Sequence, residues 1–198
     1  MAFEIEIKAR LDNPQPVQER LALLGAYRGS FEKIDAYWVQ ADTSHAGGLP
    51  PSGLRVRRET GADAEGQSRE TVLITYKTKE LQSGVEVNNE REFTVSDAAA
   101  FEELLRRLGL HPAIQKEKRG RAWQAPDGEG EPVLAELSLV RDLGWFIELE
   151  ILAADDYSQT VAQSRRRLLS LLECLGVKPE QIETRPYTEL LRNIRPAN

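Results

Sequence analysis

Cysteine and histidine are nearly absent from this chain, and long apolar runs are missing. The single cysteine, Cys174, excludes a disulfide within the chain. It stands among leucines in an expected helix, so we interpret it as a packing residue and not as a nucleophile. The two histidines, His45 and His111, form no metal-binding motif. No apolar run approaches the roughly 20 residues of a membrane-spanning helix, so no membrane partner is expected.

An excess of basic residues is also missing. Lysine and arginine total 26 against 32 aspartates and glutamates, which gives a net charge of -6. This balance argues against a general nucleic-acid-binding surface. The first residues lack the basic segment and apolar stretch of a signal peptide, so we expect a cytoplasmic protein. A length of 198 residues predicts one large domain or two small ones.

The clearest pattern lies at residues 3–11, where apolar and charged side chains alternate without a break. A period of two is typical of a half-buried strand. The charged side carries Glu4, Glu6, Lys8 and Arg10. Such a face is often only the solvent side of a sheet. Two carboxylates beside two cations can, however, also hold a metal ion together with an anionic ligand.

The remaining patterns predict an α+β fold. Further strands are expected at 33–40, 54–59, 70–79, 85–95, 113–124, 133–140 and 145–152. Helices are expected between Asn13 and Gly25, from a Ser96 cap to Leu108, and at 158–175 and 187–194. Turn-forming residues at 43–53, 61–68 and 127–130 predict loops. Because hairpins join most strands, the sheet should be largely antiparallel, and eight strands are enough to close a barrel.

The charges are sorted by strand. Acidic pairs are Glu4 with Glu6, Glu90 with Glu92 and Glu148 with Glu150; cations gather at Arg55, Arg57, Lys77, Lys116 and Lys118. Like charges two residues apart repel one another, which favours a functional, enclosed polar lumen over a plain solvent face. Carboxylate pairs without softer ligands select Mg²⁺ or Mn²⁺, and rows of arginine and lysine match the oxygens of a polyphosphate. The sequence thus predicts a metal–triphosphate site inside a barrel whose apolar outer face is covered by helices.

One family shares this pattern of motifs. Glu4-Ile-Glu-Ile-Lys8 resembles the ExExK signature of the CYTH superfamily, the triphosphate tunnel metalloenzymes. These comprise class IV adenylyl cyclases, thiamine triphosphatases and inorganic triphosphatases. Further motifs resemble the family in order: Asp35-Ala-Tyr37, Leu54-Arg-Val-Arg57, Thr75-Tyr-Lys77, Glu90-Arg-Glu92, the basic segment 116–119, the segment 143–150 and Tyr187-Thr-Glu-Leu-Leu191.

The resemblance implies a single domain over residues 1–198, folded as an eight-stranded β-tunnel. It implies Glu4, Glu6, Glu148 and Glu150 as metal-site carboxylates, with Lys8, Glu148 and Glu150 taking part in catalysis. It implies Lys8, Arg55, Arg57, Lys77 and Lys116 or Lys118 as phosphate-binding residues. The closest branch is the class IV adenylyl cyclases, which convert ATP to cyclic AMP and pyrophosphate. A homodimer is also expected.

One departure from the family pattern leaves alternatives open. Ser138 stands where the family usually carries an aspartate, and Glu136, two residues earlier on the same face, could substitute for it as a metal ligand. The basic segment also leaves open which of Lys116, Lys118 and Arg119 faces inward. The alternative functions are a triphosphatase hydrolysing thiamine triphosphate or inorganic triphosphate, and a polyphosphate- or nucleotide-binding module without turnover.

Overall fold

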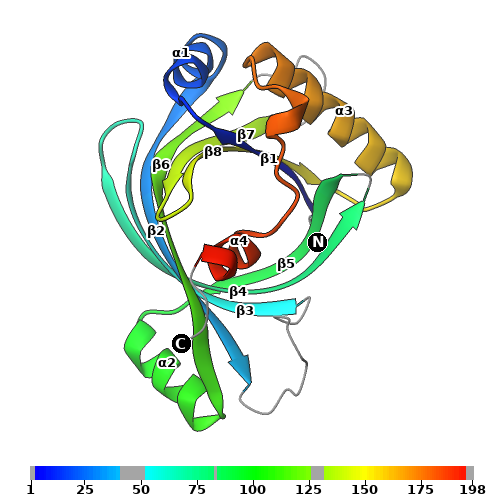
Figure 1. The fold of residues 1–198 in the computed structure, drawn as a ribbon. Coiled ribbons are helices and arrows are strands. Elements are labelled where there is room, and N and C mark those ends of the chain that lie inside the picture. Colours follow the sequence, from blue (N-terminus) through cyan, green and yellow to red (C-terminus); the bar gives the residue numbers. More distant parts are fainter. Residues whose placement is uncertain (1–2, 41–51, 83, 126–131, 195–198) are drawn as a thin grey trace.

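Eight strands form a ring that is antiparallel at every pairing (Figure 1). The computed structural model describes residues 3–40, 52–82, 84–125 and 132–194, and only the backbone of 52–53, 77–80 and 89–90. The strands pair in the closed order β1-β5-β4-β3-β2-β6-β7-β8. Their bounds are β1 (Phe3–Leu11), β2 (Ala26–Gln40), β3 (Ser52–Asp63), β4 (Ser68–Gln82), β5 (Val85–Thr94), β6 (Leu110–Ala125), β7 (Val133–Val140) and β8 (Gly144–Ala153). The predicted eight-stranded barrel is confirmed.

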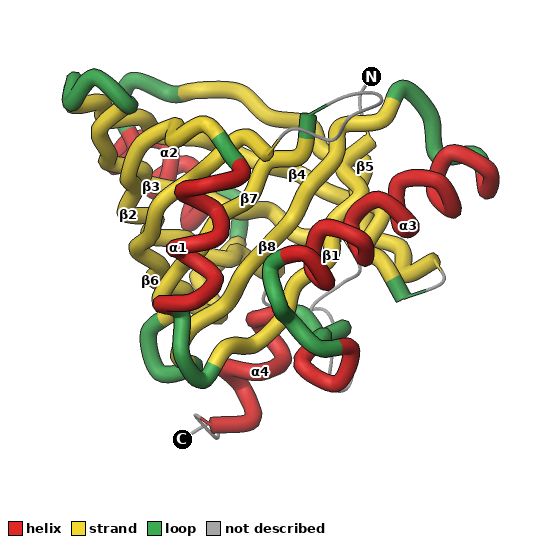
Figure 2. Tube along the Cα trace, turned by 90° about the horizontal axis from the view of Figure 1, so that it is seen from above, coloured by secondary structure: helices red, strands yellow, loops and turns green. Residues whose placement is uncertain are grey.

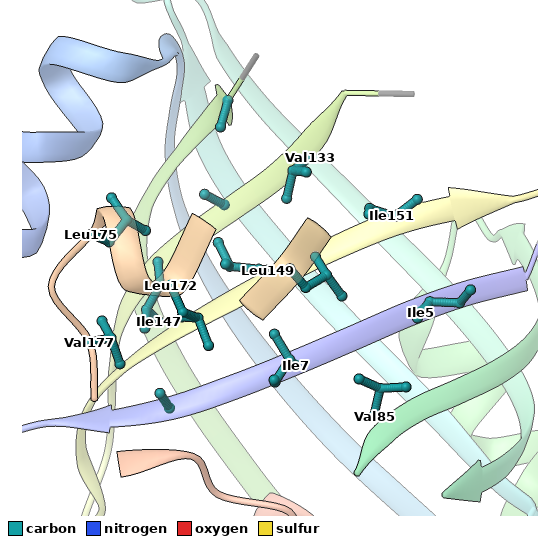
Figure 3. Close-up of a cluster of buried hydrophobic side chains, with 14 of the residues drawn as sticks. Ile5, Ile7, Val85, Val133, Ile147, Leu149, Ile151, Leu172, Leu175 and Val177 are labelled. Atoms are coloured by element: carbon teal, nitrogen blue, oxygen red, sulfur yellow. The ribbon is translucent and has the colours of Figure 1, made fainter. Parts of the chain in front are cut away.

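The outer face of one half of the ring is apolar and is covered by two helices. These are α1 (Gln15–Leu24) and α3 (Ser158–Cys174). Side chains from β1, β7 and β8 pack there with Leu172 of α3 (Figure 3). Leu21 of α1 and Leu168 of α3 belong to the same cluster. Leu21 and Leu168 are fully buried, and burying such a side chain contributes about 1.5–3 kcal/mol. The expectation that apolar faces point outward beneath helices is therefore confirmed.

Part of the opposite half is covered by α2 (Ala98–Arg107), which packs Leu105 and Phe101 against outward side chains of β2, β3 and β4. Asp97, and not the predicted Ser96, caps this helix, because its side chain accepts a hydrogen bond from the Ala100 amide at 3.0 Å. None of the helices in the described ranges is long and apolar enough to cross a membrane.

The ring closes through a short seam between β1 and β5. β1 pairs with β8 from Phe3 to Leu11 but with β5 only from Phe3 to Glu6. Past that point the C-terminal segment takes the place of β5: Ile182 bridges Ala9, and the Glu183 amide donates to the Lys8 carbonyl at 2.9 Å. The segment then leads into α4 (Tyr187–Ile194), which lies over one end of the ring (Figures 1 and 2).

Several boundaries differ from the sequence prediction. β2 begins at Ala26, seven residues before the expected start, and β3 and β4 extend into the expected loop at 61–68. A short 3₁₀ helix at Pro179–Gln181 was not predicted. Cys174 is exposed, so its interpretation as a packing residue was wrong. The expected turn at 127–130 and most of the loop at 43–53 lie outside the described residues.

Candidate active site

The lumen of the ring holds a cavity of about 750 Å³. Among the described residues, nine carboxylates and seven cationic side chains line it, together with residues 184–189 before and within α4. Ten of the predicted site residues are brought together here: Glu4, Glu6, Lys8, Arg55, Arg57, Lys116, Lys118, Glu136, Glu148 and Glu150. The eleventh, Lys77, lies on β4 opposite Glu90 and Gly53, and its side chain is outside the described part.

The acidic wall is built by the register of three neighbouring strands. Glu6 of β1 stands opposite Glu150 of β8, and Glu148 of β8 stands opposite Glu136 of β7. Directly opposed residues in antiparallel strands have Cβ atoms roughly 4.5–5.5 Å apart. Two pairs of carboxylates are therefore held side by side by the backbone itself.

Lysines compensate the inner part of this wall. Lys118 of β6 donates to Glu136 at 2.7 Å and also to Glu148, and Lys33 of β2 donates to Glu136. Burial opposes ionisation of both carboxyl groups, but Lys118 and Lys33 lower the pKa of Glu136, and Lys118 lowers the pKa of Glu148. Both glutamates are therefore ionised at neutral pH.

The cationic wall is centred on Asp35, which is fully buried. Arg57 donates to both of its carboxylate oxygens at 2.7 and 3.0 Å, Lys116 lies 2.9 Å away and Arg55 lies 3.9 Å away. Three cations thus surround one carboxylate, which leaves the cluster with an excess of positive charge. Such a cluster attracts an anion with several oxygens, because arginine binds phosphate through two donors at once.

Lys8 and α4 form the end of the lumen. Lys8 donates to Glu86 of β5 at 2.8 Å, and despite burial this carboxylate raises the pKa of Lys8. Tyr187 packs edge-on against Phe146 with ring centroids 5.0 Å apart. The ammonium groups of Lys8 and Lys116 lie 5.4 and 5.0 Å from the Tyr187 ring centroid. The start of α4 therefore belongs to the wall of the cavity.

Two questions left open by the sequence are answered. Lys116 and Lys118 both line the cavity, whereas Arg119 is exposed on the outside. Ser138 is completely buried and does not line the cavity, so the carboxylate from β7 is that of Glu136. Sequence reasoning missed Lys33 as a site residue. Its position two residues before Asp35 places it on the same strand face, and this alternation could have identified it.

A divalent metal ion fits the donor chemistry of the acidic wall. The neighbouring carboxylates, with no thiolate or imidazole among the described lining residues, suit a hard cation such as Mg²⁺ or Mn²⁺. Within the described ranges, however, no three histidine, cysteine, aspartate or glutamate side chains are grouped to hold one ion. Lys118 and Lys33 instead pair with Glu136. The predicted metal ligands therefore remain a prediction.

Comparison with known proteins agrees with this architecture. Residues 2–187 match the CYTH domain family. A Methanocaldococcus jannaschii protein named "Putative adenylate cyclase MJ0240" is 24% identical over 95% of this chain and 98% of its own length.

Two solved structures have a similar fold. The PH1819 protein of Pyrococcus horikoshii has a TM-score of 0.79 at 24% identity, covering 97% of this chain and 99% of its own. HpAC1 of Hippeastrum, described as a "putative adenylyl cyclase" that reveals a dominant triphosphatase activity, has a TM-score of 0.65 at 16% identity; the match covers 98% of this chain and 96% of the HpAC1 chain. The match to the family over nearly the whole chain shows that this protein belongs to the CYTH domain family.

Proposed function

We propose that this protein is a divalent-metal-dependent enzyme that cleaves a P–O–P bond of a triphosphate held in the lumen. The observation that carries the proposal is one cavity in which paired carboxylates on β1, β7 and β8 share the lumen with cations from β2, β3 and β6. Members of the CYTH family often act on triphosphates, which supports the same conclusion.

The cationic residues would bind the phosphate chain. Arg55, Arg57 and Lys116 outnumber their shared partner Asp35 and would contact non-bridging oxygens. Glu4, Glu6, Glu136, Glu148 and Glu150 would hold Mg²⁺ or Mn²⁺. A bound divalent ion supplies neutralisation of phosphate charge. That contribution is needed because carboxylates outnumber cations among the described lining residues.

Two reactions are compatible with these walls. In the adenylyl cyclase reaction, the ribose 3′-oxygen of ATP attacks the α-phosphorus and pyrophosphate leaves. In the triphosphatase reaction, water attacks the terminal phosphorus and a diphosphate leaves. The names of the M. jannaschii and Hippeastrum relatives favour the first and the second respectively. We place the cyclase reaction first, because the motifs of this chain look closest to that branch.

Product analysis separates the two reactions. The protein is incubated with ATP, thiamine triphosphate or inorganic triphosphate, each with Mg²⁺ or Mn²⁺. Cyclic AMP with pyrophosphate identifies a cyclase, and orthophosphate with the matching diphosphate identifies a triphosphatase. Binding without any product would contradict the enzyme proposal and indicate a binding module.

A variant tests the role of the acidic wall. Glu148→Gln should lower the rate on the order of 100-fold or more, the size of effect seen when one preorganised charge-stabilising group is removed. Glu173→Gln, exposed on the outer helix α3, is the matched control and should keep the wild-type rate. An unchanged rate in Glu148→Gln would show that Glu148 has no part in the reaction.

A further inference from the structure

Tyr187 has features that its packing role does not explain. It is the first residue of α4, it is only 7% exposed, and it lines the cavity. Its ring packs on Phe146 and lies close to the ammonium groups of Lys8 and Lys116. A phenylalanine would satisfy all of these contacts, because they involve the ring and not the hydroxyl group.

The hydroxyl group itself is buried and has no hydrogen-bond partner among the described residues. A buried polar group without a partner destabilises the folded state, so native proteins rarely keep one without a reason. An ordinary tyrosine phenol ionises only at about pH 10, and the carboxylates of Glu148 and Glu6 lie near this one. The hydroxyl is therefore protonated at neutral pH and can donate a hydrogen bond.

The surroundings of this donor offer two kinds of acceptor: the nearby carboxylate of Glu148, which already accepts from Lys118, and an anion bound in the cavity. Lys8 and Lys116, whose ammonium groups both lie near the ring, come from strands β1 and β6, and both were predicted to bind phosphate. Lys116 also belongs to the positively charged cluster around Asp35. An anion held by these two lysines would lie at the Tyr187 hydroxyl, and a phosphoryl oxygen accepts hydrogen bonds from neutral donors.

We propose that the Tyr187 hydroxyl donates a hydrogen bond to a non-bridging oxygen of the bound triphosphate, which makes α4 a substrate-binding element as well as the closure of the lumen. This inference rests on the proposed function. Ser138 offers a contrast within the same fold, because its hydroxyl is also buried without a partner but does not line the cavity.

The test compares Tyr187→Phe with Ser138→Ala, which each remove one such hydroxyl. Melting temperatures are measured with and without ATP or inorganic triphosphate in the presence of Mg²⁺, and KM and kcat are measured for the substrate that wild type turns over. Without ligand, both variants should melt at or above the wild-type temperature, because each loses an unsatisfied polar group. Triphosphate binding by Tyr187→Phe should weaken about 10- to 100-fold, the range for a hydrogen bond to a charged group, whereas Ser138→Ala should bind as wild type does.

Each contrary result points to a different error. If wild type is neither stabilised by triphosphate nor active, the proposed function fails. If wild type binds and Tyr187→Phe binds within about twofold of it, the proposed function stands and the role of the hydroxyl is refuted. A lower melting temperature of ligand-free Tyr187→Phe would show that the hydroxyl has a structural partner. An equal loss of triphosphate affinity in Ser138→Ala would show a general packing effect. Either result refutes the inference.

Discussion

Replacing Asp35 by asparagine should remove the negative charge that Arg55, Arg57 and Lys116 share within the cationic wall. The side chain keeps its size, so the packing of β2 between β3 and β6 is preserved. Arg57, however, loses the carboxylate to which it donates at 2.7 and 3.0 Å, and Lys116 loses a partner at 2.9 Å. Arg55, Arg57 and Lys116 are at most 12% exposed, so water offers them little compensation.

The expected cost follows from the burial of the cluster. Removing one partner of a buried ion pair destabilises proteins by about 3–5 kcal/mol. For a domain of this size, each kcal/mol lowers the melting temperature by about 2–4 °C, so Asp35→Asn should melt roughly 10 °C below wild type. Inorganic triphosphate without metal should recover more of the loss in the variant than it adds to wild type, because the released cations are then neutralised by the ligand.

Thermal and urea unfolding, each with and without triphosphate, check these expectations. Glu92→Gln is the matched control, because Glu92 accepts from Arg55 at 3.3 Å but its side chain is 38% exposed. Such a partly solvated pair is worth about 0–1 kcal/mol. A loss below about 1 kcal/mol in Asp35→Asn would refute the reasoning, since it would mean that the lumen solvates the three cations well.

The loss of unfolding free energy in Asp35→Asn should depend on pH in a defined direction. Burial alone would raise the pKa of Asp35, but Arg57, Lys116 and Arg55 outweigh it and hold the pKa well below the usual 3.8. The unfolded chain therefore binds the proton first as the pH falls, and the stabilisation by Asp35 is fully present above about pH 3.8. The gap in unfolding free energy between wild type and Asp35→Asn should be constant from pH 7 to 5 and narrow below 3.8. A gap that grows on acidification would contradict this sign.

Two further predictions concern neighbouring strands. Lys33→Met should change the free energy of unfolding by less than about 1 kcal/mol, because Glu136 keeps Lys118 as a partner and burial already lowers the pKa of Lys33. The affinity for triphosphate, measured by calorimetry, should nevertheless fall, because the lumen loses a cation. Gly120→Ala should destabilise by about 1–3 kcal/mol in urea unfolding, because the new Cβ would lie 2.3 Å from the Leu137 carbonyl oxygen. Gly66→Ala is the control: its new Cβ would meet no other atom, so only the positive φ of 84° would destabilise that variant. Equal losses of unfolding free energy at both positions would show that the close contact at Gly120 is not the cause.

Strand alternation made the face of each side chain predictable. A period of two is local, so it identifies the lumen residues of β1 or β8 without knowledge of the neighbours. The pairing between strands is not local. Lys118 reaches Glu136 and Glu148 from a third strand, and Asp35 meets Arg57 and Lys116 only because β2 lies between β3 and β6. Each charge could be assigned to a face from the sequence, but not to a partner.

One error and one open question show where local patterns were incomplete. The apolar stripe of α3 runs through Val161, Leu168 and Leu172 and continues to Leu175, so helical spacing turns Cys174 away from the sheet. The position of Cys174 in the helical repeat decided its exposure, and not the presence of leucines nearby in the sequence. The basic segment was ambiguous for another reason: a register shift of one residue exchanges the two faces of a strand, and the pairing of β6 with β2 has two such irregularities, one on either side of residues 116–119.

The closed end of the ring could have been inferred from a gradient along the lumen. On β7 the inward side chains change from Glu136 through Ser138 to Val140, and on β8 they change from Glu148 to Phe146 as the same end is approached. An apolar patch inside a polar lumen needs an apolar partner, because exposing it to water would cost free energy. α4 provides that partner with Leu190 and Leu191, which pack on Val140 and Phe146 in one cluster. The helix was predicted at the correct residues, and the gradient indicates why it closes this end, while the charged part of the lumen is left for a ligand.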